Sequence, residues 1–136
     1  MKSKIQKLHL LFGVWLMILL TASLVFSQVD TTPKKRLRSP AIVKGFIGGE
    51  SHDSYVIRAR RGQTITVRIS WRRSSDNRAE FSVSKSANFF NGDSVNFGKE
   101  SEGGKRWTGK IPETRNYYIY VVAHPTARYT LRVTVE

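Results

Sequence analysis

The chain has 136 residues, no cysteine, and 23 lysines and arginines against 10 aspartates and glutamates. Without cysteine it has no disulfide framework, no thiolate metal site and no cysteine for lipid attachment. A formal net charge of +13 favours acidic partners, because opposite charges attract over long distances.

The first 27 residues have the three-part layout of an export signal. Lysines begin the segment, an apolar run follows, and small residues precede a predicted cleavage site after Ser27. An uncleaved anchor is the alternative interpretation, since residues 10–26 are just long enough to span a bilayer. We predict that residues 1–27 are a signal peptide and that the protein is exported to a periplasm or to the cell exterior.

Residues 28–40 separate this segment from the rest of the chain. They hold two prolines, a basic run at residues 34–36 and almost no apolar side chains. That composition predicts a flexible basic leader. The predicted domain covers residues 41–136, and without disulfides it must be stabilised by a single hydrophobic core.

From residue 41 onward, apolar and polar side chains alternate with the period of a half-buried strand. In one such segment Ile65, Val67 and Ile69 alternate with threonines and an arginine. Predicted strands lie near residues 41–48, 53–60, 63–71, 79–85, 94–98, 105–110, 115–123 and 127–135. We predict an all-β fold: a single antiparallel β-sandwich of the jelly-roll kind, with about seven or eight strands and no helix beyond the signal peptide.

Three stretches have the motif spacing of a known family. They are DSYVIRARRGQTITV (residues 53–67), WTGKIPETRNYYIYV (107–121) and YTLRV (129–133). Together they resemble the bacterial pre-peptidase C-terminal domain, over about residues 42–136. The resemblance implies a β-sandwich with a binding or accessory role and no catalysis.

A stand-alone, exported form of this domain is similar to the inhibitors of goose-type lysozyme. In that family a long arginine-bearing loop between the last two strands enters the lysozyme cleft, whereas residues 123–128 are short here and hold one arginine. The resemblance implies an exported domain that binds or inhibits a lysozyme-like hydrolase. The loop-end residues predicted to contribute are Arg115, Tyr118, Tyr120, His124 and Arg128.

A second candidate site is a patch of arginines on the strands either side of Gly62. If those strands pair as a hairpin, their outward side chains form one surface. The predicted patch residues are Arg58, Arg60, Arg68 and Arg72. Guanidinium groups bind carboxylates and sulfates in a bidentate way, so adhesion to anionic envelope polysaccharide is the alternative function. A merely solvated strand face is the other interpretation of these arginines.

Residue types suited to catalysis are few and scattered. After export the histidines are His52 and His124, and neither stands in a nucleophile or metal motif. Glu100 and Glu102 could pair for glycoside cleavage, or join Asp93 at a calcium ion, but the segment lacks the acidic density of a calcium loop. We predict no enzyme activity, no metal and no cofactor.

The predicted partner is therefore an acidic protein or an anionic glycan. Nucleic acid is not expected, because export takes the protein away from it and no RNA-binding strand motif is present. Contact with a membrane is expected only through the signal segment, if that segment is uncleaved. The oligomeric state is left open.

Overall fold

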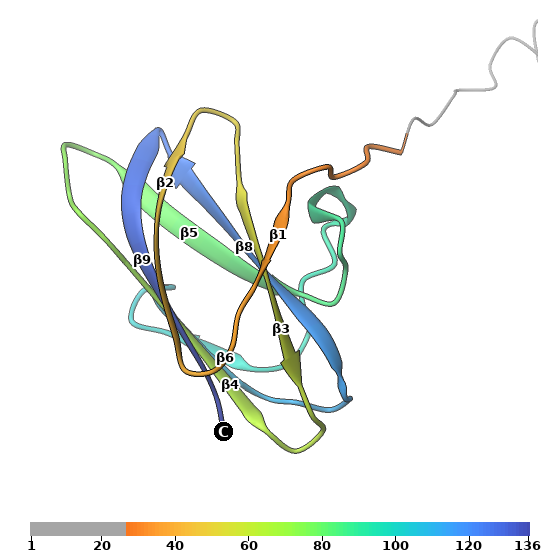
Figure 1. The fold of residues 1–136 in the computed structure, drawn as a ribbon. Coiled ribbons are helices and arrows are strands. Elements are labelled where there is room, and N and C mark those ends of the chain that lie inside the picture. The colour runs from red at the N-terminus through yellow and green to blue at the C-terminus, as the bar shows by residue number, and fades with distance from the viewer. Residues whose placement is uncertain (1–26) are drawn as a thin grey trace, which may run out of the picture.

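The structure is a computed structural model that describes residues 27–136, so the predicted signal peptide, apart from Ser27, lies outside the described residues (Figure 1). Within that range the chain forms nine strands and a single 3-10 turn, η1 (Phe89–Asn91). The strands are β1 (Lys34–Arg36), β2 (Ala41–Gly48), β3 (Asp53–Ala59), β4 (Thr64–Trp71), β5 (Arg78–Ser84), β6 (Lys99–Ser101), β7 (Arg106–Lys110), β8 (Arg115–His124) and β9 (Thr126–Val135). The all-β prediction is confirmed. Residues 27–136 contain no helix with the length and apolar character needed to cross a membrane.

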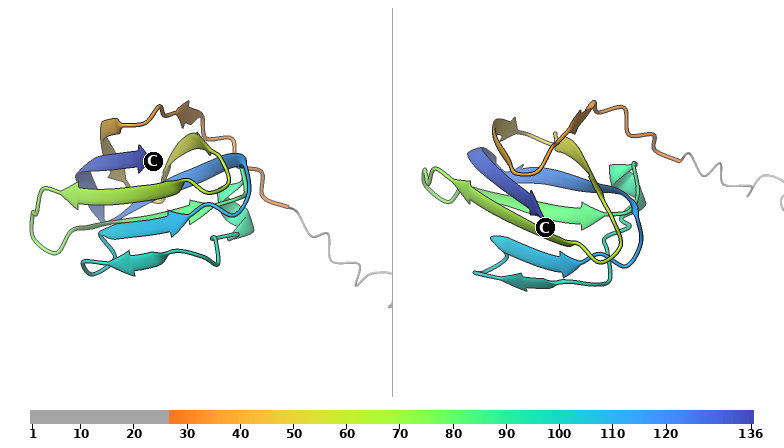
Figure 2. Two further views of the ribbon diagram at one scale, coloured as in Figure 1. Left: turned by 90° about the horizontal axis from the view of Figure 1, so that it is seen from below. Right: turned by 60° about the horizontal axis from the view of Figure 1, so that its bottom comes forward.

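The strands form two sheets that pack face to face as a sandwich. One sheet has four strands in the order β1-β3-β8-β5, and the other has five in the order β2-β9-β4-β7-β6. Every strand pair is antiparallel except β1 with β3. Figure 2 gives two further views, in which the short β6 lies outside β7 at one edge of its sheet.

The core lies between the sheets and follows from the alternation in the sequence. Ile65 and Val67 of β4 are fully buried, and they belong to one core cluster with Ile119 and Val121 of β8, which are equally buried. Each such side chain stabilises the fold by roughly 1.5–3 kcal/mol through burial of apolar surface. The intervening side chains of β4 point outward, which places its polar residues on the outer face.

The predicted hairpin across Gly62 is wrong. β3 pairs with β8 in the four-stranded sheet, whereas β4 pairs with β7 and β9 in the other sheet. The turn between them carries the chain from one sheet to the other. Gly62 takes a φ of +90° there, and its N–H donates a 2.8 Å hydrogen bond to the carbonyl of Ile111. Strand alternation identifies the buried face but not the neighbouring strand, so it cannot distinguish a hairpin from a crossing between sheets.

The expectation of a flexible leader over residues 28–40 is also wrong for its central part. β1 pairs in parallel with β3, and Leu37, which follows it, is buried in the core. The N–H of Leu37 donates a 2.8 Å hydrogen bond to the carbonyl of Val56. The basic composition of the leader concealed this strand, because only one apolar side chain anchors it.

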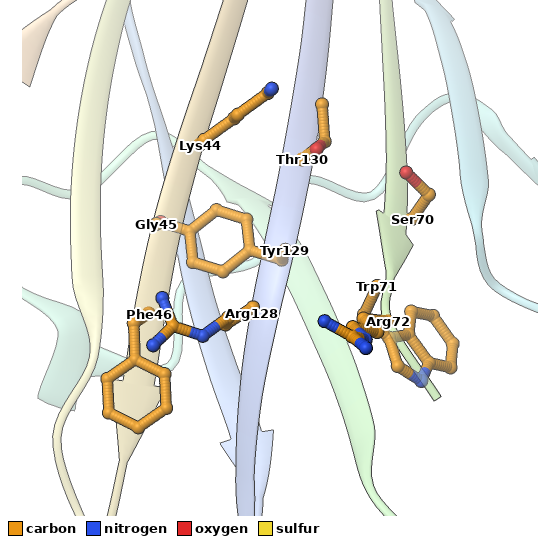
Figure 3. A pocket seen from close by; sticks show the side chains of 9 residues that line it. All are labelled: Lys44, Gly45, Phe46, Ser70, Trp71, Arg72, Arg128, Tyr129 and Thr130. Atoms are coloured by element: carbon orange, nitrogen blue, oxygen red, sulfur yellow. The ribbon is translucent and has the colours of Figure 1, made fainter. Parts of the chain in front are cut away.

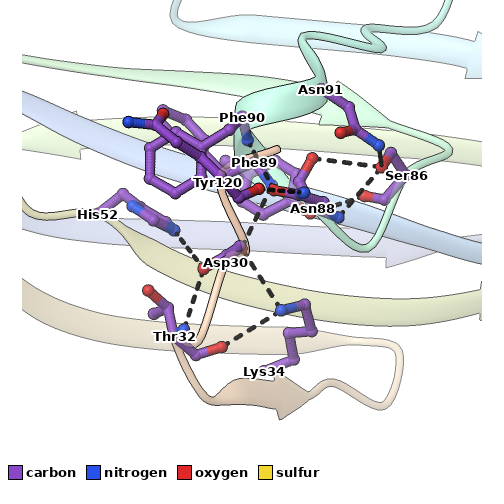
Figure 4. Close-up of polar contacts among 11 residues, drawn as sticks. Asp30, Thr32, Lys34, His52, Ser86, Asn88, Phe89, Phe90, Asn91 and Tyr120 are labelled. Carbon is purple, nitrogen blue, oxygen red and sulfur yellow. Dashed lines mark hydrogen bonds and ion pairs between the residues drawn. The ribbon is translucent and has the colours of Figure 1, made fainter. Parts of the chain in front are cut away.

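Asp30 fastens the start of the described chain to the sandwich (Figure 4). Its carboxylate accepts hydrogen bonds from the backbone N–H groups of Thr32 at 2.9 Å and Phe89 at 3.2 Å. It also lies 3.4 Å from Lys34 Nζ and 3.2 Å from His52 Nε2. Burial acts to raise the pKa of Asp30, but the two backbone hydrogen bonds and the lysine outweigh it and lower the pKa to about 2.

The strand predicted at residues 94–98 is not formed there, and the next strand in the chain is β6. Phe97 packs against the ring of Trp107, with centroids 5.9 Å apart, and Gly98 then takes a φ of +87°. A side chain at Gly98 would meet the Trp107 ring at 2.4 Å. Pairing with β7 therefore begins only after this glycine.

Candidate functional site

Arg72 and Arg128 meet at the end of the sandwich where β4 ends and β9 begins. The backbone N–H of Arg72 donates a 3.1 Å hydrogen bond to the carbonyl of Arg128. The β4–β5 loop, residues 72–77, is held beside the β8–β9 turn by the Asn77 side-chain amide, which donates to the carbonyl of Thr126 at 3.3 Å. Two loops far apart in sequence thus form one surface.

A groove with a volume of about 530 Å³ lies on the outer face of β2, β9 and β4 at this end (Figure 3). It is lined by Lys44, Gly45, Phe46, Ser70, Trp71, Arg72, Arg128, Tyr129 and Thr130. A second hollow adjoins it, shares Phe46, Arg72 and Arg128, and adds Arg73. We call the two together the arginine groove. None of its lining residues is acidic.

Aromatic side chains form the walls of the arginine groove. The Arg128 guanidinium lies over the exposed ring of Phe46, 5.4 Å from its centroid, in a cation–π contact. On the other side the Trp71 indole N–H donates a 3.1 Å hydrogen bond to the carbonyl of Asn77. Figure 3 shows Arg128 directed toward Phe46 and Arg72 beside Trp71. The Arg128 side chain is therefore partly held in place before any partner binds.

Tyr129 forms the floor of the arginine groove. Its hydroxyl donates a hydrogen bond to the carboxylate of Asp53, so the hydroxyl of Tyr55, 2.5 Å away, must be the donor in the contact between the two tyrosines. Burial, followed by these hydrogen bonds, raises the pKa of Tyr129 far above its ordinary value. The Tyr129 hydroxyl is therefore neutral and is bonded to residues of β3 in the other sheet.

The cations of the arginine groove have no acidic partner. Among residues 27–136, Lys44, Arg72, Arg73 and Arg128 form no ion pair with a carboxylate within 4.0 Å. Some arginines elsewhere are paired, since Arg68 lies 2.8 Å from Glu102 and Arg78 lies 2.8 Å from Glu80. Carboxylates of residues 27–136 therefore do not neutralise the positive charge of the groove through ion pairs.

The four arginines of the predicted patch do not share a surface. Arg58 is exposed on the outer face of the four-stranded sheet, and Arg60 lies in the turn that follows β3. Arg68 is on the outer face of the other sheet, where it is paired with Glu102. Of the four, Arg72 alone belongs to the arginine groove. The predicted patch required β3 and β4 to pair as a hairpin, and these strands belong to different sheets.

The predicted loop-end residues are likewise separated. Arg115 and His124 are the two ends of the ten-residue β8, about 30 Å apart at the usual rise per residue. Arg115 donates a 2.9 Å hydrogen bond to the carbonyl of Lys85, and His124 Nε2 lies 3.8 Å from a carboxylate oxygen of Glu80. Arg128 is the member of this set that reaches the arginine groove.

Tyr120 is not available for binding, although the sequence predicted that role. Its side chain is 2% exposed, and its hydroxyl donates a 2.6 Å hydrogen bond to the carbonyl of Ser86. Burial, together with the negative charge of Asp30, raises its pKa to about 12. Tyr118 stacks on it with ring centroids 6.5 Å apart. The loop of residues 85–97 covers this part of β8, which strand alternation could not show.

Sequence reasoning missed Lys44, Phe46 and Arg73, and did not assign Trp71 to a binding surface. The sequence did hold an indication of this surface. Phe46 and Lys44 are two residues apart and so point to the same, outward side of their strand, where an aromatic side chain is unexpected. The tandem arginines at the end of β4 were a second signal. Within residues 27–136 no cluster of three or more His, Asp or Glu side chains is placed to hold a metal ion.

The fold and the groove define a small two-sheet β-sandwich with a basic surface at one end. Its fold is shared with PliG of Aeromonas hydrophila, a periplasmic lysozyme inhibitor of g-type lysozyme. The TM-score is 0.63 with 23% identity over 79% of this chain and 100% of that one. PliG of Salmonella Typhimurium, likewise a periplasmic inhibitor of g-type lysozyme, gives a TM-score of 0.52 with 17% identity over 76% of this chain and 98% of that one.

The pre-peptidase C-terminal domain of a Bacillus anthracis collagenase has the same fold. It gives a TM-score of 0.57 with 16% identity, over 79% of this chain and 100% of that chain. No protein-family model matches the sequence, and no curated protein matches it either. The structural likenesses confirm the fold that the three sequence motifs predicted.

Proposed function

We propose that this protein is an exported, non-catalytic binding domain that inhibits a lysozyme-like hydrolase through the arginine groove. The observation that carries the proposal is the meeting of Arg72, Arg73 and Arg128 around an exposed Phe46, without an acidic side chain in the lining. The fold supports it, because two of its structural neighbours are inhibitors of g-type lysozyme.

The chemistry of the groove suits the active site of a glycoside hydrolase. Such enzymes commonly place carboxyl groups on both sides of the scissile bond, in a cleft that excludes water. Planar guanidinium groups bind carboxylates in a bidentate way, and an aromatic ring adds apolar contact area at little entropic cost. An inhibitor that places arginines against those carboxylates blocks both substrate entry and proton transfer.

Two loops replace the single long loop of the lysozyme inhibitors in this proposal. The β8–β9 turn is short, because β8 ends at His124 and β9 begins at Thr126. The adjacent β4–β5 loop contributes Arg72 and Arg73, and hydrogen bonds of its own tie it to that turn. The positive charge needed for a cleft therefore comes from two segments.

Export is part of the proposal. The amino-terminal segment has the layout of a signal peptide, and the two inhibitors that share the fold are described as periplasmic. A periplasmic or extracellular location would place this protein where lysozymes attack the cell wall.

The proposal is tested with the secreted protein, purified after removal of any signal, against goose-type, chicken-type and invertebrate-type lysozymes. Peptidoglycan lysis is followed by turbidity, and direct binding by calorimetry. We expect stoichiometric inhibition of at least one type, with affinity that falls as salt is added. Full lysis by every type at an excess of the protein would exclude the proposal.

A further inference from the structure

The outer face of the five-stranded sheet is basic along its whole length. β2, β4, β7 and β9 contain no acidic residue. Glu100 of the short edge strand β6 lies opposite the buried Trp107, so its side chain is on the other face of the sheet. Their basic residues are Lys44, Arg68, Arg106, Lys110, Arg128 and Arg132. The four-stranded sheet differs, because its strands mix basic residues with Asp53 and Glu80. The molecule therefore has one strongly positive broad face.

One row across this face concentrates like charge. Arg132 of β9 lies opposite Ile42 of β2 on one side and opposite Arg68 of β4 on the other. Arg68 in turn lies opposite Arg106 of β7. Like charges directly opposite on neighbouring strands destabilise a sheet. Glu102 relieves part of this repulsion, at 2.8 Å from Arg68 and 3.9 Å from Arg106.

Arg132 is left without such relief. No carboxylate lies within 4.0 Å of it in the part of the chain that the structure describes. Folding alone does not explain three arginines in register, since it would favour an acid or a neutral side chain at one of these positions. An external anionic surface does explain them.

The edge of the same face is apolar. β2 is an edge strand, and on its outward side Ile42 and Phe46 are 59% and 58% exposed, with Lys44 between them. The two apolar side chains stand about 13 Å apart along the strand. An exposed strand edge of this kind is usually protected by charge, because apolar edges promote association.

The combination of positive charge and an apolar edge indicates which kind of partner fits this face. An acidic glycan would satisfy the arginines but offers no apolar phase for Ile42, and single-stranded nucleic acid would require a row of aromatic rings for its bases. The surface of an anionic bilayer satisfies both, because its headgroups attract Lys and Arg while its acyl boundary accepts apolar side chains. We propose that this face docks the protein on a bilayer surface rich in anionic phospholipid, with the edge of β2 inserted.

This proposal does not depend on hydrolase binding, although Phe46 and Arg128 belong to both surfaces. Ile42 and Arg132 lie outside the lining of the arginine groove. They are therefore the positions at which the bilayer surface is tested separately. A change at these two residues is expected to leave any hydrolase inhibition intact.

The test is co-sedimentation of the secreted protein with vesicles of phosphatidylcholine alone, or mixed with phosphatidylglycerol. We expect binding to the mixed vesicles only, reduced about tenfold or more by Ile42→Ser with Arg132→Ser. Arg58→Ser with Val29→Ser is the matched control, since it removes one charge and one exposed apolar side chain elsewhere. Glu102→Gln should strengthen binding several-fold, because it frees Arg68.

Three outcomes would overturn the bilayer proposal. The first is no binding to the mixed vesicles, and the second is an equal loss of binding in the control variant. The third is full competition by a soluble acidic polysaccharide with no effect of Ile42→Ser, which would show general anion binding instead. Unchanged thermal unfolding of each variant confirms that the fold is intact.

Discussion

The backbone N–H of Arg72 donates a 3.1 Å hydrogen bond to the carbonyl oxygen of Arg128. This bond joins one arginine from the predicted strand patch to one from the predicted loop site. One residue from each of the two sites predicted from the sequence therefore belongs to the arginine groove, and the other predicted residues lie elsewhere.

If the arginine groove binds an acidic cleft, Arg72→Ala and Arg128→Ala should each weaken hydrolase inhibition about tenfold or more, as removal of a central charged contact does. The single changes Arg58→Ala and Arg60→Ala each remove the same charge from other parts of the molecule and should change the inhibition constant little. Inhibition constants measured as a function of salt check both. Equal losses in the two pairs would indicate an effect of net charge and not of the groove.

Gly45→Ala should lower the free energy of unfolding by about 2 kcal/mol, because the added Cβ overpacks the site. The new atom would lie 2.5 Å from Tyr129 Cζ, and the Tyr129 ring is tethered through its hydroxyl to Asp53. Urea denaturation measures the change. Gly48→Ala on the same strand meets a Thr126 methyl at 3.2 Å and the Phe46 ring at 3.6 Å, and it should cost less. Equal costs would contradict the close packing of Tyr129 beneath Gly45.

Tyr129→Phe should destabilise the fold by about 2 kcal/mol, and Tyr55→Phe by about 1 kcal/mol. Tyr129→Phe removes the group that donates to Asp53 and accepts from Tyr55. Tyr55→Phe removes only the donor at the end of this row of hydrogen bonds. The double variant should cost less than the sum of the two single variants. A double-mutant cycle by urea denaturation measures the coupling, and strict additivity would exclude a continuous hydrogen-bond chain.

Asp30 should make stability depend on acid pH. Its pKa is about 2 in the folded state against an ordinary value of 3.8, so the folded state binds this proton more weakly than the unfolded state. The resulting stabilisation, about 2 kcal/mol, is complete above about pH 4 and disappears as the pH falls to about 2. Urea denaturation of the wild type and Asp30→Asn should therefore show a difference near neutral pH that vanishes in strong acid.

The control for this pH dependence is Asp76→Asn. Asp76 is exposed and forms no ion pair within residues 27–136, so its replacement should have little effect at either pH. A difference between wild type and Asp30→Asn that stays constant with pH would show that Asp30 acts by shape and not by charge.

Alternation of side chains by itself determined the strands and their buried faces. Ile65 and Val67 had to face a core, because a strand projects successive side chains to opposite sides. Segment boundaries agreed with the structure to within a residue or two for most strands. The three motif stretches also identified the fold, since their aromatic and glycine positions recur where the core and the turns require them.

The tertiary structure decided which strands are neighbours, and with that the site. Arg58 and Arg68 each alternate with apolar residues along a strand, yet they lie on the outer faces of different sheets, because the turn at Gly62 crosses between the sheets. Arg72 and Arg128 are far apart in the chain and come together only through that strand order. Local periodicity reflects burial on one strand, whereas pairing depends on contacts between distant segments, so the sequence alone did not bring Arg72 and Arg128 together.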